Sequence, residues 1–210
     1  MSVSPTTRWM QARAIERIGR IIAIPELWTR LALAIIAVIA ITVSLATAPG
    51  SVGLLGAGLA IVMIAIAAVD WRRFVIPDWL NAVGLGLALV HAALQEPDAM
   101  PSAVATATLR GAALALIFLA LRNGYALIRG RQGLGLGDVK LAAVAGAWLD
   151  WLVIPIAIEL AAFAALTIYL FRHLAFGGSI SATNRLPFGA FFAPAIWVSW
   201  VLEMKLFVPF

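Results

Sequence analysis

Residues 31–48 read LALAIIAVIAITVSLATA, a run that carries no charge. A transmembrane helix needs about 20 predominantly apolar residues to cross the hydrocarbon core of a bilayer. The run lacks the alternation of apolar and polar residues of a barrel strand, and backbone polar groups have no water partners in lipid. The sequence therefore predicts a membrane-spanning helix here.

Similar apolar runs follow along the rest of the chain. The predicted spans are Leu31–Ala48, Val52–Val69, Pro77–Leu94, Ala105–Leu121, Val139–Leu149, Leu152–Leu170 and Phe188–Phe207. Only Asp150 and Trp151 separate the fifth run from the sixth, so these two are either separate helices or one kinked segment. The expected fold is all-α, a polytopic membrane helix bundle of about six to seven transmembrane helices.

The composition supports this prediction. Of 210 residues, 63% are hydrophobic and 12% charged, against about 45–50% and about 25% in soluble domains. So much apolar surface cannot be buried in one small core. The absence of Cys excludes disulfides, Cys-ligated zinc and a thiol nucleophile, and the two His lie far apart. We predict no metal site and no cofactor.

Basic residues alternate between the connections. Those that precede the first span or follow the second, fourth and sixth include Arg8, Arg13, Arg17, Arg20, Arg30, Arg72, Arg73, Arg122, Arg129, Arg131, Arg172 and Arg185. The other connections carry almost none, with Arg110 and Lys205 as the exceptions. The positive-inside rule then places the N-terminus in the cytoplasm and explains the net charge of +5 without a nucleic-acid partner.

Two regions are expected. Residues 1–30 form a basic N-terminal segment, which is either an amphipathic helix on the lipid surface or a solvated tail that sets the orientation. Residues 31–210 form the transmembrane domain. Within it, Glu159 favours a helix–helix hydrogen bond over catalysis, His91 a polar contact inside a helix, and His173 an interfacial position.

Two carboxylates stand where predicted spans meet the cytoplasmic side. Asp70 closes the second span, where the helix macrodipole disfavours a negative charge, and Arg72 or Arg73 could simply neutralise it. Asp138 follows the glycine-rich segment 133–137 and could be a plain N-cap of the fifth span.

Two carboxylates in one cleft are the requirement for aspartyl hydrolysis. Close like charges share a proton, so the ionised member can activate water while the protonated member polarises the scissile carbonyl. The helix positions favour Asp138 as the anion and Asp70 as the neutral acid. The glycines would let a substrate segment lie extended against the backbone.

The order of the motifs resembles that of the type IV prepilin peptidases, which are bacterial membrane aspartic proteases. The matching blocks are Asp70 with Ile76-Pro77-Asp78-Trp79-Leu80-Asn81, then Gly135-Leu136-Gly137-Asp138-Val139-Lys140-Leu141, then Leu186-Pro187-Phe188-Gly189-Ala190-Phe191. The resemblance runs from about residue 52 to the end of the chain.

This resemblance implies that Asp70 and Asp138 are the catalytic pair. The residues expected to support them or to bind substrate are Asp78, Asn81, Gly135, Gly137, Lys140, Pro187 and Gly189. The implied substrates are prepilins or pseudopilins, cut at the cytoplasmic face of the bacterial inner membrane. The chain looks like a short form of the family without the Cys-rich cytoplasmic domain, so no methyltransferase activity or methyl donor is expected.

Two other interpretations fit part of the pattern. Presenilin-type intramembrane proteases also use a Gly-x-Gly-Asp block, but they pair it with Tyr-Asp and Pro-Ala-Leu, where this chain has Val69-Asp70 and Pro187-Phe188-Gly189. A small proton-coupled transporter would use Asp70, Asp138 and Glu159 as relay groups. A relay needs polar groups across the bilayer, whereas Asp70 and Asp138 are predicted on one side.

Overall fold

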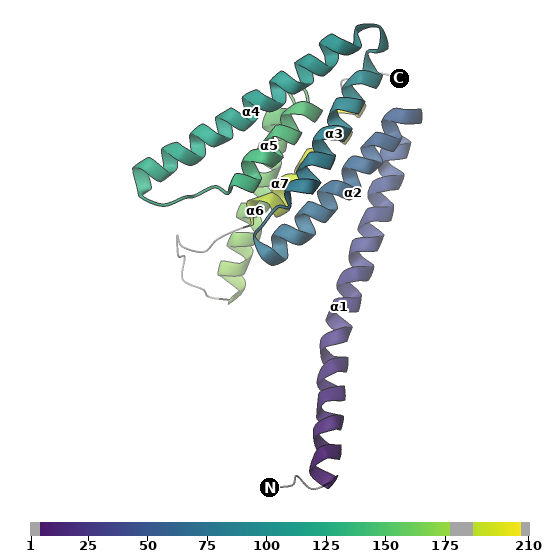
Figure 1. The fold of residues 1–210 in the computed structure, drawn as a ribbon, viewed down its shortest axis with the longest axis vertical. Helices are drawn as coiled ribbons and strands as arrows, with labels where there is room; N and C mark the ends of the chain where they lie inside the picture. The colour runs from purple at the N-terminus through teal and green to yellow at the C-terminus, as the bar shows by residue number, and fades with distance from the viewer. Residues whose placement is uncertain (1–4, 177–186, 207–210) are drawn as a thin grey trace. The chain divides into compact units, whose positions relative to one another are not determined.

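A computed structural model of the chain describes the secondary structure of residues 5–176 and 187–206. These residues form seven α-helices and one short 3-10 helix, and no strand occurs among them (Figure 1). The elements are α1 (Pro5–Thr47), α2 (Gly50–Arg73), α3 (Asp78–Gln95), η1 (Pro97–Ala99), α4 (Met100–Arg129), α5 (Leu136–Trp148), α6 (Ile154–Phe176) and α7 (Phe188–Leu206). The predicted all-α class is confirmed.

The helix boundaries refine the predicted spans. The fifth and sixth apolar runs are separate helices, because α5 ends at Trp148 and α6 begins at Ile154. Helix α4 continues eight residues beyond the predicted end at Leu121, to Arg129. The chain divides into two compact units, residues 1–39 and 40–210, and helix α1 begins in the first and ends in the second. The site lies in residues 40–210.

Within the residues that the structure describes, four segments are long and apolar enough to cross a membrane. They are Glu26–Thr47, Gly50–Arg73, Pro97–Arg129 and Ile154–Phe171. Large apolar side chains also cover their outer surfaces, including Leu109 and Leu116 on α4 and Phe163 on α6, each more than half exposed. Such a surface suits lipid as the solvent.

Helices α5 and α7 form the centre of the second unit. Helices α3 and α4 pack against α5, while α2 and α6 pack against α7. The largest buried side chains, Trp200, Phe192, Leu59, Met63 and Ile66, fill the space between α2 and α7 and their neighbours. Burial of apolar surface between these helices places the aspartate-bearing ends of α2 and α5 near the start of α7.

Helices α4 and α5 cross at a pair of glycines. A Cβ atom added to Gly111 would lie 2.7 Å from the carbonyl oxygen of Ala143, and one added to Gly146 would lie 2.6 Å from the carbonyl oxygen of Arg110. Neither distance leaves room for a methyl group, so the two backbones are in direct contact. This is the close approach that small residues allow in membrane helices.

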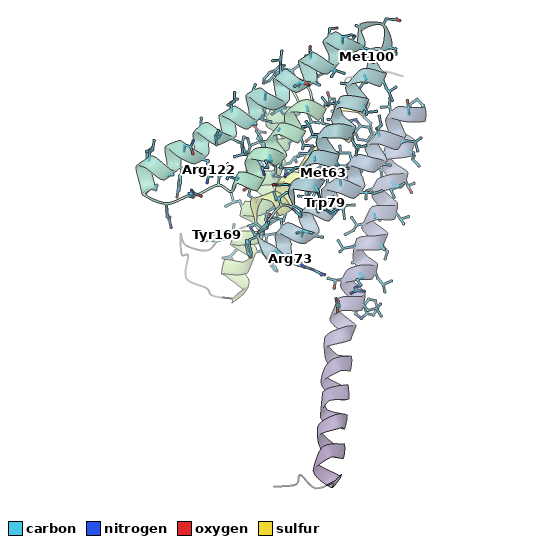
Figure 2. The ribbon with its side chains drawn as sticks, in the orientation of Figure 1. Met63, Arg73, Trp79, Met100, Arg122 and Tyr169 are labelled. Carbon is cyan, nitrogen blue, oxygen red and sulfur yellow. The ribbon has the colours of Figure 1, made fainter. Side chains whose placement is uncertain are left out.

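Two ends of the unit formed by residues 40–210 matter for the site. Figure 2 labels Met100 at the end where α4 begins, and Arg73, Trp79 and Arg122 toward the opposite end. At this second end Arg122 holds the α4–α5 loop, since its Nε donates to the carbonyl oxygen of Leu134 (3.2 Å) and its guanidinium to Oε1 of Gln132 (2.7 Å). We call this second end the aspartate end and the first the Met100 end.

Candidate active site

Asp70 lies in the last turn of α2, with only 5% of the residue exposed. The helix stops four residues later at Phe74, whose left-handed backbone (φ 54°) directs its N–H to the carbonyl oxygen of Asp70 at 2.9 Å. A carboxylate in a last turn is opposed by the dipole of its own helix. Its stabilisation must therefore come from another element.

That element is the start of α7. The backbone N–H of Ala190 donates to Oδ2 of Asp70 at 2.9 Å, and the N–H of Gly189 also interacts with this carboxyl group. The first N–H groups of a helix have no partners inside the helix and carry its positive dipole end. Pro187, which is buried, precedes this first turn. The sequence block around Pro187 and Gly189 thus supplies backbone N–H donors to Asp70.

Asp138 lies in the first turn of α5. Its Oδ2 accepts a hydrogen bond from the backbone N–H of Gly135 at 3.0 Å. The N-cap position belongs to Gly135, so the interpretation of Asp138 as a plain N-cap is wrong by three residues. The helix begins earlier than predicted because the glycine-rich segment can enter it directly.

The two carboxyl groups interact electrostatically across α2 and α5. Asp138 precedes the predicted fifth span, and burial raises the pKa of its carboxyl from 3.8 to about 6. The N–H of Gly135 works against this rise, the negative charge of Asp70 adds to it, and the N–H of Gly189 again opposes it. Gly189 therefore faces both acids.

Ile76 joins the three predicted blocks. A Cβ atom added to Gly137 would lie 3.0 Å from Cβ of Ile76, and one added to Gly189 would lie 2.5 Å from Cδ1 of Ile76 and 2.9 Å from Oδ2 of Asp70. The side chain of Ile76, itself buried, thus packs against both glycines. Segments from residues 70–76, 137–138 and 187–190 meet at one place, although they lie far apart in the sequence.

Lys140 and Asp78 form an ion pair between α5 and α3. Nζ of Lys140 donates to Oδ1 of Asp78 at 2.6 Å, and both side chains are about half exposed or more. The pair ties the helix that carries Asp138 to the helix that follows Asp70. The predicted supporting roles of these two residues stay predictions.

Asn81 is buried on α3, with 5% of the residue exposed. Among the described residues, neither its amide nitrogen nor its amide oxygen has a hydrogen-bond partner. A buried primary amide in this state keeps both a donor and an acceptor available. No contact in the described chain joins it to the aspartates, so its predicted role in binding substrate stays a prediction.

The interpretation that a neighbouring arginine neutralises Asp70 is wrong. Within residues 5–176 and 187–206, neither Arg72 nor Arg73 forms an ion pair with Asp70, which pairs with backbone N–H groups instead. Glu159 is exposed on α6, and its predicted hydrogen bond to another helix stays a prediction. His173 lies outside the residues whose side chains are described.

Sequence reasoning missed the backbone donors of Gly189 and Ala190. The signal was present, because a proline followed by an apolar run marks a helix start, and a helix start leaves N–H groups free. What the sequence did not contain was the direction in which these groups point. That direction depends on how α7 packs against α2.

Comparison with known proteins identifies the family. Residues 57–170, slightly more than half of the chain, match the type IV leader peptidase family. The chain belongs to this family. The match contains Asp70 and Asp138 together with the first two sequence blocks, whereas the third block lies outside it.

Individual relatives show the same similarity. The chain is 38% identical over 103 residues to leader peptidase HopD of Escherichia coli, an alignment that covers 49% of this chain and 63% of that protein. It is 35% identical over 113 residues to leader peptidase HopD of Salmonella typhimurium, covering 54% of this chain and 68% of that protein. It is 33% identical over 88 residues to a prepilin leader peptidase/N-methyltransferase of Aeromonas hydrophila, covering 40% of this chain and 28% of that protein.

The chain thus spans between about a quarter and two thirds of the length of these relatives. No solved structure matches the chain.

Proposed function

We propose that the chain is a membrane-embedded aspartic endopeptidase that removes the short basic leader from prepilins or pseudopilins. The observation that carries this proposal is the meeting of Asp70, Asp138 and the start of α7, in a chain that belongs to the type IV leader peptidase family. Relatives named leader peptidase and prepilin leader peptidase support the substrate class.

The proposed reaction needs one proton shared between the two carboxyl groups. The ionised carboxylate takes a proton from water, and the water oxygen forms a bond to the scissile carbonyl carbon. The protonated carboxyl donates its proton to the carbonyl oxygen, which gives a neutral tetrahedral diol. The carboxyl that took the water proton then donates it to the amide nitrogen, while the other carboxylate accepts a proton from one diol hydroxyl. The C–N bond breaks, the leader and the new N-terminus are released, and one proton is again shared between the two carboxyl groups.

The N–H groups of Gly189 and Ala190 have a specific role in this proposal. They supply fixed positive partial charge to the acids without bringing in a cation that would hold a carboxyl permanently ionised. The proton can then move between Asp70 and Asp138 during the reaction. Asp138 as the initial anion and Asp70 as the initial acid remains our assignment.

Charge supports the proposed membrane orientation. Arg72, Arg73, Arg122 and Arg129 lie toward the aspartate end, so the positive-inside rule favours our proposal that this end faces the cytoplasm at the inner membrane. Exposed Trp71 and Trp79 flank the site and suit the membrane interface. A prepilin leader in the cytoplasm would then reach the acids while the apolar helix of the substrate stays in lipid.

The transporter alternative receives less support. A relay would need polar groups between the two ends of the unit, but most of the described core there is apolar, with side chains such as Leu59, Met63 and Val144. We do not extend the N-methyltransferase part of some relatives' names to this chain, because the alignments with those proteins cover only about a quarter of their length.

Co-expression with a prepilin tests the proposal. We expect Asp70→Asn and Asp138→Asn each to lower leader cleavage by at least about 1,000-fold, because Asn keeps the shape but cannot exchange a proton. The matched control is Asp98→Asn, which changes an exposed acid in η1 and should cleave at the wild-type rate. Mass spectrometry of the pilin N-terminus gives the readout, and wild-type cleavage by either site variant would refute the mechanism.

A further inference from the structure

A second polar site lies at the Met100 end, away from the aspartates. A cavity of about 200 Å³ opens between the end of α3, the first half of α4, the end of α5 and the last turns of α7. The walls that matter for its chemistry are formed by His91, Arg110, Trp148, Asp150 and Glu203. None of these residues belongs to the proposed peptidase site.

Three of the wall residues are already joined to one another. The guanidinium of Arg110 forms an ion pair with Oδ1 of Asp150, and the backbone N–H of Asp150 donates to Oε1 of Glu203 at 3.1 Å. Arg110 was an exception to the positive-inside pattern, and this pairing accounts for it. The contacts connect α4, the α5–α6 junction and α7 around the cavity.

Other polar atoms of the same walls are unsatisfied. Oε2 of Glu203, Nε of Arg110 and Nε1 of Trp148 are buried and have no hydrogen-bond partner among the described residues. Glu203 is only 7% exposed. Leaving a buried carboxylate oxygen and buried N–H donors without partners costs free energy, so a group that fills these positions is expected to bind.

The atoms without hydrogen-bond partners indicate which kind of ligand the cavity would bind. Oε2 of Glu203 needs a hydrogen-bond donor, preferably a cation, because the neighbouring Arg110 charge is engaged by Asp150. His91 and Trp148, whose rings stack with centroids 4.7 Å apart, form a buried inner wall of the cavity. On the other side, Nε of Arg110 needs an acceptor, preferably an anion.

We propose that this cavity binds a small zwitterion, whose primary ammonium group donates to Glu203 and whose anionic group accepts from Arg110. The headgroup of an ethanolamine phospholipid carries both groups and fits a cavity of this volume. Such a headgroup is also available at the right depth, because α3 and α5 end beside the cavity after their apolar runs, at Gln95 and Trp148. Free phosphoethanolamine has the same two groups without the acyl chains.

Lipid retention by the full-length chain tests this proposal. The protein is exchanged in mixed micelles that contain equal amounts of ethanolamine and choline phospholipid with the same acyl chains, and bound lipid is counted by native mass spectrometry. We expect at least a tenfold preference for the ethanolamine lipid, because a quaternary choline has no N–H to donate to Oε2 of Glu203. Glu203→Gln, which keeps the size of the side chain, should reduce the preference to less than twofold.

Two further variants make the result specific. Glu159→Gln removes an exposed carboxylate on α6, away from the cavity, and should keep the wild-type preference. Thr106→Trp, an exposed position on the cavity wall, should abolish retention by blocking the cavity while leaving Glu203 and Arg110 in place. Thr106→Trp also tests the site if Glu203→Gln does not fold.

Competition by free phosphoethanolamine distinguishes binding of a phospholipid headgroup from binding of the free small molecule. Displacement of the lipid at millimolar concentration supports a site that reads the headgroup alone, and retention of the lipid supports a site that also needs the lipid tails. Equal retention of ethanolamine and choline lipids, or an unchanged preference in Glu203→Gln, would overturn the proposal and leave ordered water as the occupant of the cavity.

Discussion

The two ends of the helical unit provide different partners for their acidic side chains. At the aspartate end, Asp70 and Asp138 accept hydrogen bonds from backbone N–H groups, and no described residue forms an ion pair with either. At the Met100 end, Asp150 is paired with the guanidinium of Arg110, and Glu203 is held by the N–H of Asp150.

This difference separates an acid with a cationic partner, Asp150, from acids whose partners are backbone N–H groups. A guanidinium is always protonated and holds its carboxylate in the ionised form. Backbone N–H groups supply partial charges only, so the proton on the acid remains exchangeable. The contrast between the two ends therefore lies in the partner of the acid, a guanidinium for Asp150 and backbone N–H groups for Asp70 and Asp138, and the predictions below test it.

The largest effect among these predictions is for Gly189→Ala. The added methyl group would lie 2.9 Å from Oδ2 of Asp70 and 2.5 Å from Cδ1 of Ile76, so the start of α7 must move away from the acids. We expect leader cleavage to fall roughly 100-fold because the geometry of the site is lost. Gly86→Ala on α3, where a methyl meets nothing within 4 Å, is the control and should cleave normally.

Asp138→Asn should stabilise the protein at neutral pH although it inactivates it. Since the folded pKa of about 6 lies above the ordinary 3.8, ionisation of Asp138 costs folding stability at pH values above 6, and this cost disappears as the pH falls from 6 toward 3.8. Removing the charge should add about 2 kcal/mol at pH 7.5 after allowance for partial solvent access. Denaturant unfolding in micelles at pH 7.5 and at pH 4.5 measures it, and an equal gain at both pH values would contradict this origin.

Asp150→Asn should have the opposite sign. The substitution removes the carboxylate that neutralises Arg110, whose side chain is only 16% exposed. Because the Asp150 side chain itself is well exposed, we expect a loss of about 1 kcal/mol in the free energy of unfolding. The same unfolding assay checks this value, and stabilisation by both Asp138→Asn and Asp150→Asn would remove the proposed difference between the two ends.

The smallest effect concerns the ion pair of Lys140 and Asp78. Both side chains are well exposed, so a double-mutant cycle with Lys140→Met and Asp78→Asn should give a coupling of about 0.5 kcal/mol that shrinks in high salt. Cleavage should fall less than tenfold in Asp78→Asn. A loss as large as that of Asp70→Asn would instead place Asp78 among the catalytic residues.

Much of the fold could be predicted from the sequence, because apolar runs of membrane length leave the chain few alternatives to helices. The ends of the helices were harder. Helix α4 continues past Leu121 through polar residues, since Arg122 is satisfied by Leu134 and Gln132 of the following loop. A hydropathy pattern does not contain such contacts.

The site was predictable only in part. The blocks around Asp70 and Asp138 were recognisable from their residues and order, but the hydrogen bond between Ala190 and Asp70 joins positions 120 residues apart. The pair of Arg110 with Asp150 is 40 residues apart and fits no local pattern. Contacts of this kind depend on how helices pack, so they required the three-dimensional structure.

Helix α4 stays packed on the core beyond the contact of Gly111 with Gly146. Leu114 and Phe118 are buried, and the ring of Phe118 stacks on that of Phe192 of α7. Only the following 11 residues, up to Arg129, extend past this contact, a length of about 17 Å. Arg122 in this outer part holds the loop that leads into Asp138, so a small displacement there would reach the loop before it reached the buried helices.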